Sequence, residues 1–238
     1  SIWLTDGSSN NTFSHLTIKN ATIGLLIQNN DGTTVSIKNT QIYNSSNYGI
    51  LAQTAKINGE NLVINNAGLA SLACTYGGNY SFTHATFNNN WNSSKQVAVL
   101  VSNYISGAIP EAKALTMATF NNCIIYGSYS NEMSLTRKTG AAFEYQFNNC
   151  LIKFDNVSNQ FTPNADYQFN TDSAHYNAIL LNKDPKFFNT SQNKFNIDAT
   201  SAAFAKGNSA YLIPLDILGN TRSLPPDLGA YQNNVFPK

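Results

Sequence analysis

The chain has 238 residues, of which 42% are hydrophobic and only 11% are charged. Fourteen basic and thirteen acidic residues give a formal net charge of +1, and neither sign forms a block that could track phosphates or anionic lipid. No stretch approaches the roughly 18 consecutive apolar residues of a membrane-spanning helix. We therefore expect one domain, 1–238, that is monomeric, has no membrane span and does not bind nucleic acid.

The N-terminus indicates a segment that continues a larger fold. Residue 1 is Ser, so we expect a mature or trimmed piece of a longer protein whose targeting signal would lie upstream. Residues 2–4 are expected to form a strand inside a solenoid, with an exposed or truncated edge. We expect N-terminal coils to be missing, and a lipid anchor at the missing N-terminus is compatible with this expectation.

A short pattern recurs along residues 1–160: a large apolar residue, one spacer and then Asn. The apolar anchors are Ile18, Ile37, Ile64, Phe87, Phe120 and Phe147, and Asn follows two residues after each. The spacing between anchors varies while the local pattern persists, which is typical of solenoid repeats with insertions in their loops.

Apolar and polar residues alternate around each anchor, as in LTI at 16–18 and VSI at 35–37, and this alternation predicts short strands. Asn readily adopts a left-handed backbone conformation and therefore bends one strand into the next. We predict stacked parallel coils with one ladder of Asn side chains and one column of apolar anchors. Cys123 and Cys150 would then stack in adjacent coils, where a disulfide is possible but not required.

The C-terminal third contains several short motifs in a fixed order. They are Asp184-Pro185-Lys186-Phe187, Phe195-Asn196-Ile197, SAAFAKGN at 201–208, DILGNTR at 216–222, and Pro226-Asp227-Leu228-Gly229-Ala230-Tyr231. Arg222 is one of two arginines in the chain. We hypothesise that it forms an ion pair with Asp216 or Asp227 and so fixes a cap over the last coil, because an open solenoid end would expose strand edges.

These motifs and the coils together resemble right-handed parallel β-helix proteins of the pectate-lyase-like superfamily. The closing segment resembles that of secreted or surface proteins of Bacteroidota, which end in a Pro-Asp-Ile-Gly-Ala-Tyr type of motif. The resemblance implies an all-β, right-handed parallel β-helix with coils over 1–160 and the last coil and a C-terminal cap over 161–238. It also implies an extracellular or outer-surface location, but no single activity.

Catalytic candidates are sparse. Lyases of this superfamily use Lys, Arg or His as a base, so the resemblance implies weak candidates at Arg137, Lys138, Lys153 and His84. Lys113 and Tyr145 are further options. Arg137 and Lys138 lie in the longest irregular insertion, 128–140, and loops that project from a solenoid often carry function. Up to residue 160, no two acidic residues lie within three places of each other, so paired carboxylates of a hydrolase are not evident.

Metal-ligand spacing is also missing. The three histidines are scattered, and Cys74, Cys123 and Cys150 match no zinc pattern, so we expect no metal or other cofactor, and nothing indicates calcium. The cysteines are expected to be small buried apolar residues.

Aromatic residues in or beside the predicted inter-coil loops are the stronger functional signal. Trp91, Tyr129, Tyr126 and Tyr104 are the candidates for stacking on sugar rings, while neighbouring Asn side chains would bond hydroxyl groups. We therefore expect a non-catalytic extracellular or cell-surface module that binds a polysaccharide or serves as a scaffold. The alternative is a polysaccharide lyase, or a glycoside hydrolase, that acts on an acidic polysaccharide.

Overall fold

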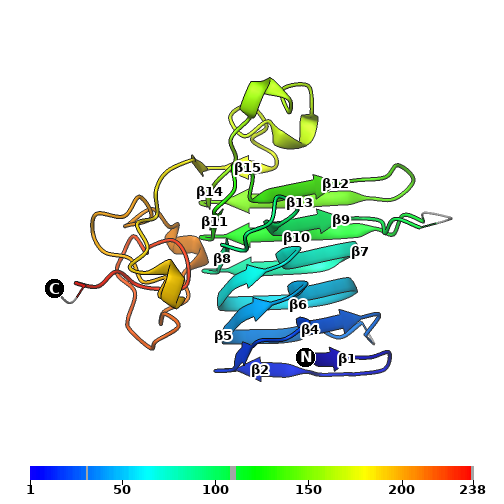
Figure 1. Ribbon diagram of the computed structural model, residues 1–238, viewed down its shortest axis with the longest axis horizontal. Helices are drawn as coiled ribbons and strands as arrows, with labels where there is room; N and C mark the ends of the chain where they lie inside the picture. Colours follow the sequence, from blue (N-terminus) through cyan, green and yellow to red (C-terminus); the bar gives the residue numbers. More distant parts are fainter. Residues whose placement is uncertain (31, 108–110, 237–238) are drawn as a thin grey trace.

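The computed structural model describes residues 1–30, 32–107 and 111–236, and it shows an all-β parallel solenoid of about 7 turns (Figure 1). Each turn runs through three strand positions, and strands at the same position in successive turns pair in parallel. This confirms the predicted β-helix. The long strands β5 (Val35–Ser45), β6 (Tyr48–Ala67) and β7 (Ala70–Thr83) continue around corners, so each contributes to more than one strand position.

We call the three columns of strands faces A, B and C. Face A contains β1 (Ile2–Leu4), β4 (Ile23–Gln28), the first parts of β6 (Tyr48–Ala67) and β7 (Ala70–Thr83), β9 (Val97–Ser102) and β12 (Met133–Thr136). Face B contains β2 (Thr12–Ser14), the first part of β5 (Val35–Ser45), the middle of β6, the end of β7, β10 (Leu115–Asn121), β13 (Phe143–Asn148) and β15 (Tyr176–Asn177). Face C contains β3 (Thr17–Lys19), the ends of β5 and β6, β8 (Thr86–Asn89), β11 (Ile124–Gly127), β14 (Leu151–Ile152) and β16 (Leu180–Leu181).

The strand predicted at the N-terminus is confirmed as β1. It pairs with β4, and within the described chain its other edge has no strand partner.

The interior is filled by side chains that alternate inward along every strand, as the period of two requires. On face B the rings of Phe82, Phe120, Phe147 and Tyr176 stack through successive coils, with centroids 5.4, 4.7 and 5.6 Å apart. Offset aromatic stacking adds about 0.5–1.5 kcal/mol per pair to the burial of apolar area. The interior column thus stabilises the register of the coils.

The predicted Asn ladder exists, but as two ladders at different corners. Between faces B and C the left-handed corner residues include His15, Asn39, Asn61, His84, Asn122 and Asn149, with φ between +46° and +55°. Between faces C and A they include Asn20, Asn44 and Asn66, with φ of +57°, +59° and +57°. The amide of Asn44 donates to Asn20 at 3.3 Å, and that of Asn66 donates to Asn44 at 3.1 Å.

The single column of anchors predicted from the repeat is therefore wrong. Ile37, Phe120 and Phe147 belong to face B, whereas Ile18, Ile64 and Phe87 belong to face C. The reason is that the same motif, an apolar residue, a spacer and Asn, can end a strand at any corner of a coil. Each coil has more than one corner, so the anchors fall in more than one column.

One end of the solenoid is covered by residues 155–175, which include the short 3-10 helices η1 (Val157–Asn159) and η2 (Ala165–Tyr167). In Figure 1 this segment lies beyond β12 and β15, at the top. Rings of Phe161 and Tyr167 pack on Phe154, with centroids 4.9 and 4.6 Å away. The hydroxyl of Tyr167 also accepts a 2.8 Å hydrogen bond from the backbone N–H of Leu135. The segment thereby protects the last strand edges from solvent.

The C-terminal segment 183–236, with η3 (Thr190–Gln192) and η4 (Ser209–Tyr211), lies along face C rather than over the end (Figure 1). Strands of face C carry apolar side chains on both sides, so their outer side must also be buried. Tyr43 and Val63 pack there with Phe195, Ile217 and Tyr231. We call residues 183–236 the flank.

Arg222 is buried in the flank, but its place differs from the hypothesis. Its Nη2 donates to Oδ1 of Asn61 at 2.9 Å and to the carbonyl oxygens of Gly229 and Ala230 at 3.1 Å. Within the described residues it makes no direct ion pair with Asp216 or Asp227. Those carboxylates instead accept backbone N–H groups of the flank, so the ion-pair hypothesis is wrong.

The three cysteines are free and buried, as expected for small apolar residues. Cys123 and Cys150 lie at equivalent positions of adjacent coils, as predicted, without a disulfide. In the described part of the chain, no helix has the length and apolar character needed to cross a membrane.

Candidate functional site

Face A is the uncharged face of the solenoid. Its six strand segments, all of them described, contain no Asp, Glu, Lys or Arg. Face B, in contrast, carries exposed or half-buried charges such as Lys38, paired with Glu60 at 2.9 Å. Face C is covered by the flank. Face A is therefore the one of the three strand columns that is both uncharged and not covered by the flank.

Two rows of outward side chains follow the axis of face A. The first row consists of Trp3, Leu26, Leu51, Ala73, Leu100 and Ser134, in register from coil to coil. The second row consists of Gln28, Gln53, Thr75, Ser102 and Thr136. Amide groups of Gln28 and Gln53 bond each other at 2.6 Å. A row that is apolar from Trp3 to Leu100 and ends in Ser134 therefore lies beside a row of amide and hydroxyl groups.

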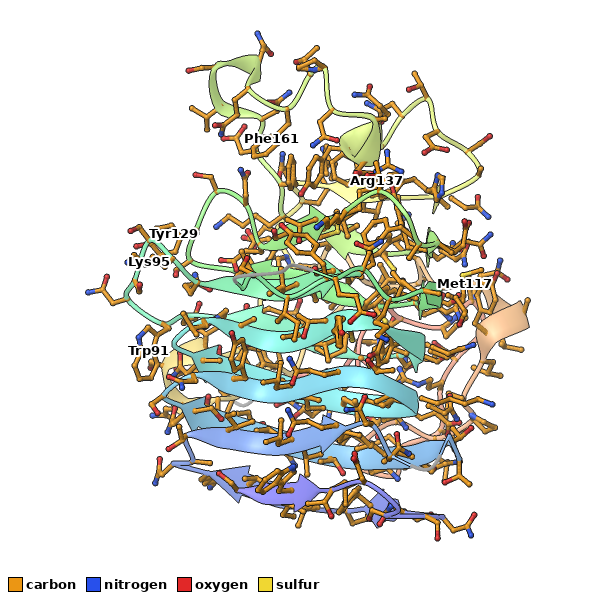
Figure 2. All side chains as sticks on the ribbon, turned by 90° about the vertical axis from the view of Figure 1, so that its right-hand side faces the viewer. Trp91, Lys95, Met117, Tyr129, Arg137 and Phe161 are labelled. Atoms are coloured by element: carbon orange, nitrogen blue, oxygen red, sulfur yellow. The ribbon has the colours of Figure 1, made fainter. Side chains whose placement is uncertain are left out.

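Loops rise at both edges of this face. Figure 2 shows Trp91, Lys95 and Tyr129 along one edge of this face, whereas Met117, on the other side of the view, belongs to β10 of face B. Trp91 and Lys95 belong to the loop 90–96 between β8 and β9, and Tyr129 belongs to the loop 128–132 one coil further on. Tyr104 follows β9 at the other edge of face A. We call face A together with these loops the trough.

The trough contains distinct hollows. A cleft of about 350 Å³ is lined by Lys95, Gln96, Tyr129 and Ser134, with Phe161 of the end segment above it. A second hollow of about 220 Å³ lies beside Tyr104. It is lined as follows: Tyr48, Leu51, Gln53, Thr75, Leu100, Ser102, Tyr104, Ile105, Ser106 and Thr136. The second hollow has no charged residue in its lining, and the first has one, Lys95.

The edge with Trp91 and Tyr129 contains a buried carboxyl group, that of Glu132, which was not among the candidate residues. Oε1 of Glu132 accepts hydrogen bonds from the backbone N–H of Tyr129 at 2.7 Å and from Nε2 of Gln96 at 3.3 Å. Oε2 has no hydrogen-bond partner among the described protein groups. Burial is the main cause that raises the pKa of Glu132 to about 8, and the hydrogen bonds and Lys153 oppose this shift.

The four aromatic candidates are all partly exposed, but they do not form one row. Trp91 and Tyr129 share one edge of the trough, and Tyr104 lies at the other. Tyr126 lies outside, in a neighbouring pocket of about 450 Å³ that it shares with Ser128, Ser130 and Lys153. Its ring centroid is 5.0 Å from Nζ of Lys153.

The four catalytic candidates lie at three different corners of the coils. Arg137 and Lys138 follow β12 between faces A and B, Lys153 follows β14 between faces C and A, and His84 lies between faces B and C. The structure therefore does not bring them together around one reacting bond.

Each candidate already has a structural partner. Nε of Arg137 lies 3.2 Å from Oδ2 of Asp166, which belongs to the end segment. The backbone of Lys138 exchanges hydrogen bonds with the side chain of Asn103 at 2.8 and 2.9 Å. Nζ of Lys153 donates to the carbonyl oxygen of Gly127 at 2.7 Å.

His84 is fully buried beneath the flank, where its Nε2 lies 3.2 Å from Nδ2 of Asn122. Burial, and next the nearby Arg222, lower the pKa of His84 to about 3. The imidazole is therefore uncharged at neutral pH and is a corner residue of the ladder between faces B and C.

Tyr145, a further option for a base, is also buried. Its hydroxyl donates to Asp166 at 3.3 Å, and burial raises its pKa above the ordinary value. Among the described residues, no group of three His, Cys, Asp or Glu side chains is arranged to hold a metal ion.

The rows of face A were not identified from the sequence, although a signal was present. Leu26-Ile27-Gln28 recurs as Leu51-Ala52-Gln53, and outward positions on a strand share this alternation. This repeat is weaker than the Asn pattern at the corners next to faces B and C. Searches of protein-family models and of curated proteins found no match to the chain.

Proposed function

We propose that this chain is a non-catalytic module that binds carbohydrate, and that the trough is its binding surface. The observation that carries the proposal is the pairing of an apolar row with an amide and hydroxyl row on an uncharged face, between loops that carry Trp91, Tyr129 and Tyr104. Following the resemblance, we place the module in the pectate-lyase-like superfamily, of the Bacteroidota type, outside the cell or on its outer surface.

Sugar rings have apolar C–H faces and hydroxyl edges, so a chain of them matches such a surface. Leu26, Leu51 and Leu100 offer apolar contact, and the half-buried Gln28, Gln53 and Thr136 beside them can bond hydroxyl groups. Trp91 and Tyr129 present amphipathic rings at the edge. The lack of charge on the floor favours a neutral polysaccharide, because a buried unpaired carboxylate would lose its hydration without compensation.

The dispersed positions of the catalytic candidates support binding without turnover. A general acid and a general base must reach the same scissile bond within hydrogen-bond distance. Arg137, Lys153 and His84 lie at separate corners, and His84 is buried. In the linings of the two hollows of the trough the one charged side chain is Lys95, and the buried carboxyl group of Glu132 faces the loop backbone.

The test is a panel of soluble neutral and acidic polysaccharides, with retardation in affinity gels as the readout for binding and ultraviolet absorbance of unsaturated uronates as the readout for lyase activity. We expect retardation by one or more neutral polysaccharides and no ultraviolet product. Product formation from an acidic polysaccharide, lost in Arg137→Ala or Lys153→Ala, would overturn the proposal and establish the lyase alternative.

A further inference from the structure

The two loops at one edge of the trough are joined beneath the surface by a single side chain. Glu132 is fully buried, and one of its carboxyl oxygens holds both the backbone of Tyr129 and the amide of Gln96. Tyr129 belongs to the loop 128–132, whereas Gln96 ends the loop 90–96 that also carries Trp91. Both Gln96 and Tyr129 line the cleft at this edge.

The space for this carboxyl group exists because residue 127 is glycine. A Cβ atom at Gly127 would lie 2.2 Å from Oε1 of Glu132, a distance that excludes any other residue in this arrangement. The backbone of Glu132 is also fixed, since its N–H donates to the carbonyl oxygen of Lys153 at 3.0 Å and its own carbonyl accepts from Val99 at 2.9 Å. The carboxyl group is therefore built into the edge.

The surroundings contain little that would stabilise an ionised form. Lys153, at the end of β14, is the charged group that acts on Glu132 within the described residues, and its Nζ is already bonded to Gly127. From β9 and its preceding loop come neutral groups, namely Gln96 and the backbone of Ala98. From its own loop comes the N–H of Tyr129.

We propose that Glu132 is the positioning residue of this edge and makes carbohydrate binding in the trough dependent on pH. The inference rests on the proposed function and deepens it. In the protonated form, Oε1 accepts hydrogen bonds from both loops, and no charge has to be buried. Ionisation places a negative charge where burial disfavours it. Separation of the loops lets water hydrate the carboxylate, so ionisation of Glu132 favours the separated arrangement. Tyr129 and Gln96 then move away from their positions in the lining of the cleft. The affinity for carbohydrate therefore falls as pH rises.

The experiment uses the full chain with Trp3→Phe, which leaves Trp91 as its single tryptophan, and compares Glu132 with Glu132→Gln. The amide keeps the acceptor oxygen and cannot ionise. Affinity for the bound polysaccharide and the emission of Trp91 are measured from about pH 6 to about pH 9.5, a range centred near the pKa of the buried group. Glu144→Gln, which removes an exposed carboxylate on face B, is the matched control.

We expect affinity of the Glu132 protein to fall about fivefold or more across this range, a typical coupling between two sites, while Glu132→Gln changes less than about twofold. The emission of Trp91 should shift with the same midpoint in the Glu132 and Glu144→Gln proteins and stay constant in Glu132→Gln. If Glu132→Gln follows the same pH profile as the Glu132 protein in both readouts, the inference is wrong.

The two proposals fail separately. If no polysaccharide binds at any pH, the proposed function is wrong, whereas the emission of Trp91 still decides whether Glu132 positions the edge. Circular dichroism of each variant, which should retain the β-sheet spectrum, shows that a loss of affinity does not come from unfolding.

Discussion

Arg222 donates a 2.9 Å hydrogen bond from Nη2 to Oδ1 of Asn61, a residue 161 positions earlier in the chain. Asn61 is a left-handed corner residue of the solenoid, and its amide also donates to Asn39 in the preceding coil and to the carbonyl oxygen of Leu215. One side chain of the ladder between faces B and C thus anchors the flank. Face C is buried by this attachment, which leaves face A as the uncharged face that the flank does not cover.

Replacing Arg222 by Leu should loosen the flank. The side chain is 5% exposed and makes three hydrogen bonds, and hydrogen bonds of charged groups contribute about 1.5–3 kcal/mol each before non-additivity. We expect the free energy of unfolding to fall by about 2–4 kcal/mol, and backbone amides of 214–232 to exchange faster with deuterium. Arg137→Leu is the control. Arg137 is half-exposed, so its replacement should lower the free energy of unfolding by about 1 kcal/mol or less. Equal losses in the two variants would contradict the role of Arg222.

The aromatic column on face B should dominate the stability of the upper coils. Phe120 is fully buried between Phe82 and Phe147, so Phe120→Ala should lower the free energy of unfolding by about 3–5 kcal/mol in denaturant titrations. Phe188→Ala, at a ring of the flank that is 37% exposed, should lower the free energy of unfolding much less. A loss below about 1 kcal/mol for Phe120→Ala would show that the coils are not packed on this column.

The three cysteines should remain thiols. They are fully buried and unpaired, and burial raises the pKa of Cys74 and of Cys150 well above the ordinary value. Thiolate is the reactive form, so the folded protein should react very slowly with a thiol reagent. After unfolding without a reductant, the chain should release its full count of 3 thiols. Recovery of a single thiol would reveal a disulfide and contradict the structure.

Glu132 should make stability fall with rising pH. Its pKa is about 8 in the folded chain, above the ordinary value of 4.5, so the folded state retains a proton that the unfolded state releases between these values. The free energy of unfolding therefore falls by up to about 1.4 kcal/mol per pH unit in that window. Glu132→Gln should be equally stable near pH 4 and more stable than the natural chain near pH 8. Parallel stability curves from pH 4 to 8 would contradict the burial of this group.

The coils could be predicted from the sequence because an apolar residue, a spacer and Asn form a local signal, and Asn occupies many of the left-handed corners. The assignment of these corners to one ladder failed, since the signal is the same at two corners of a coil. Phe87 and Phe120 follow the same motif yet belong to faces C and B. Their positions depend on the number of residues in each loop, which local patterns do not determine.

The candidate site was predicted in part. Trp91 and Tyr129 were expected in or beside inter-coil loops, and the loops that carry them share an edge of the trough. Glu132 could not be singled out, because its role depends on the absence of a side chain at Gly127 and on Gln96 in another coil. Both are long-range relations that the spacing of acidic residues does not reveal.

The most direct test of the central claim places a charge on the floor of the trough. Leu51→Glu puts a carboxylate in the apolar row of face A, and Thr119→Glu puts one at an equally half-buried outward position on face B. With the neutral polysaccharide that retards the natural chain in an affinity gel, our account predicts that Leu51→Glu abolishes retardation and Thr119→Glu leaves it unchanged. Undiminished retardation of a folded Leu51→Glu protein would contradict the assignment of the trough as the binding surface.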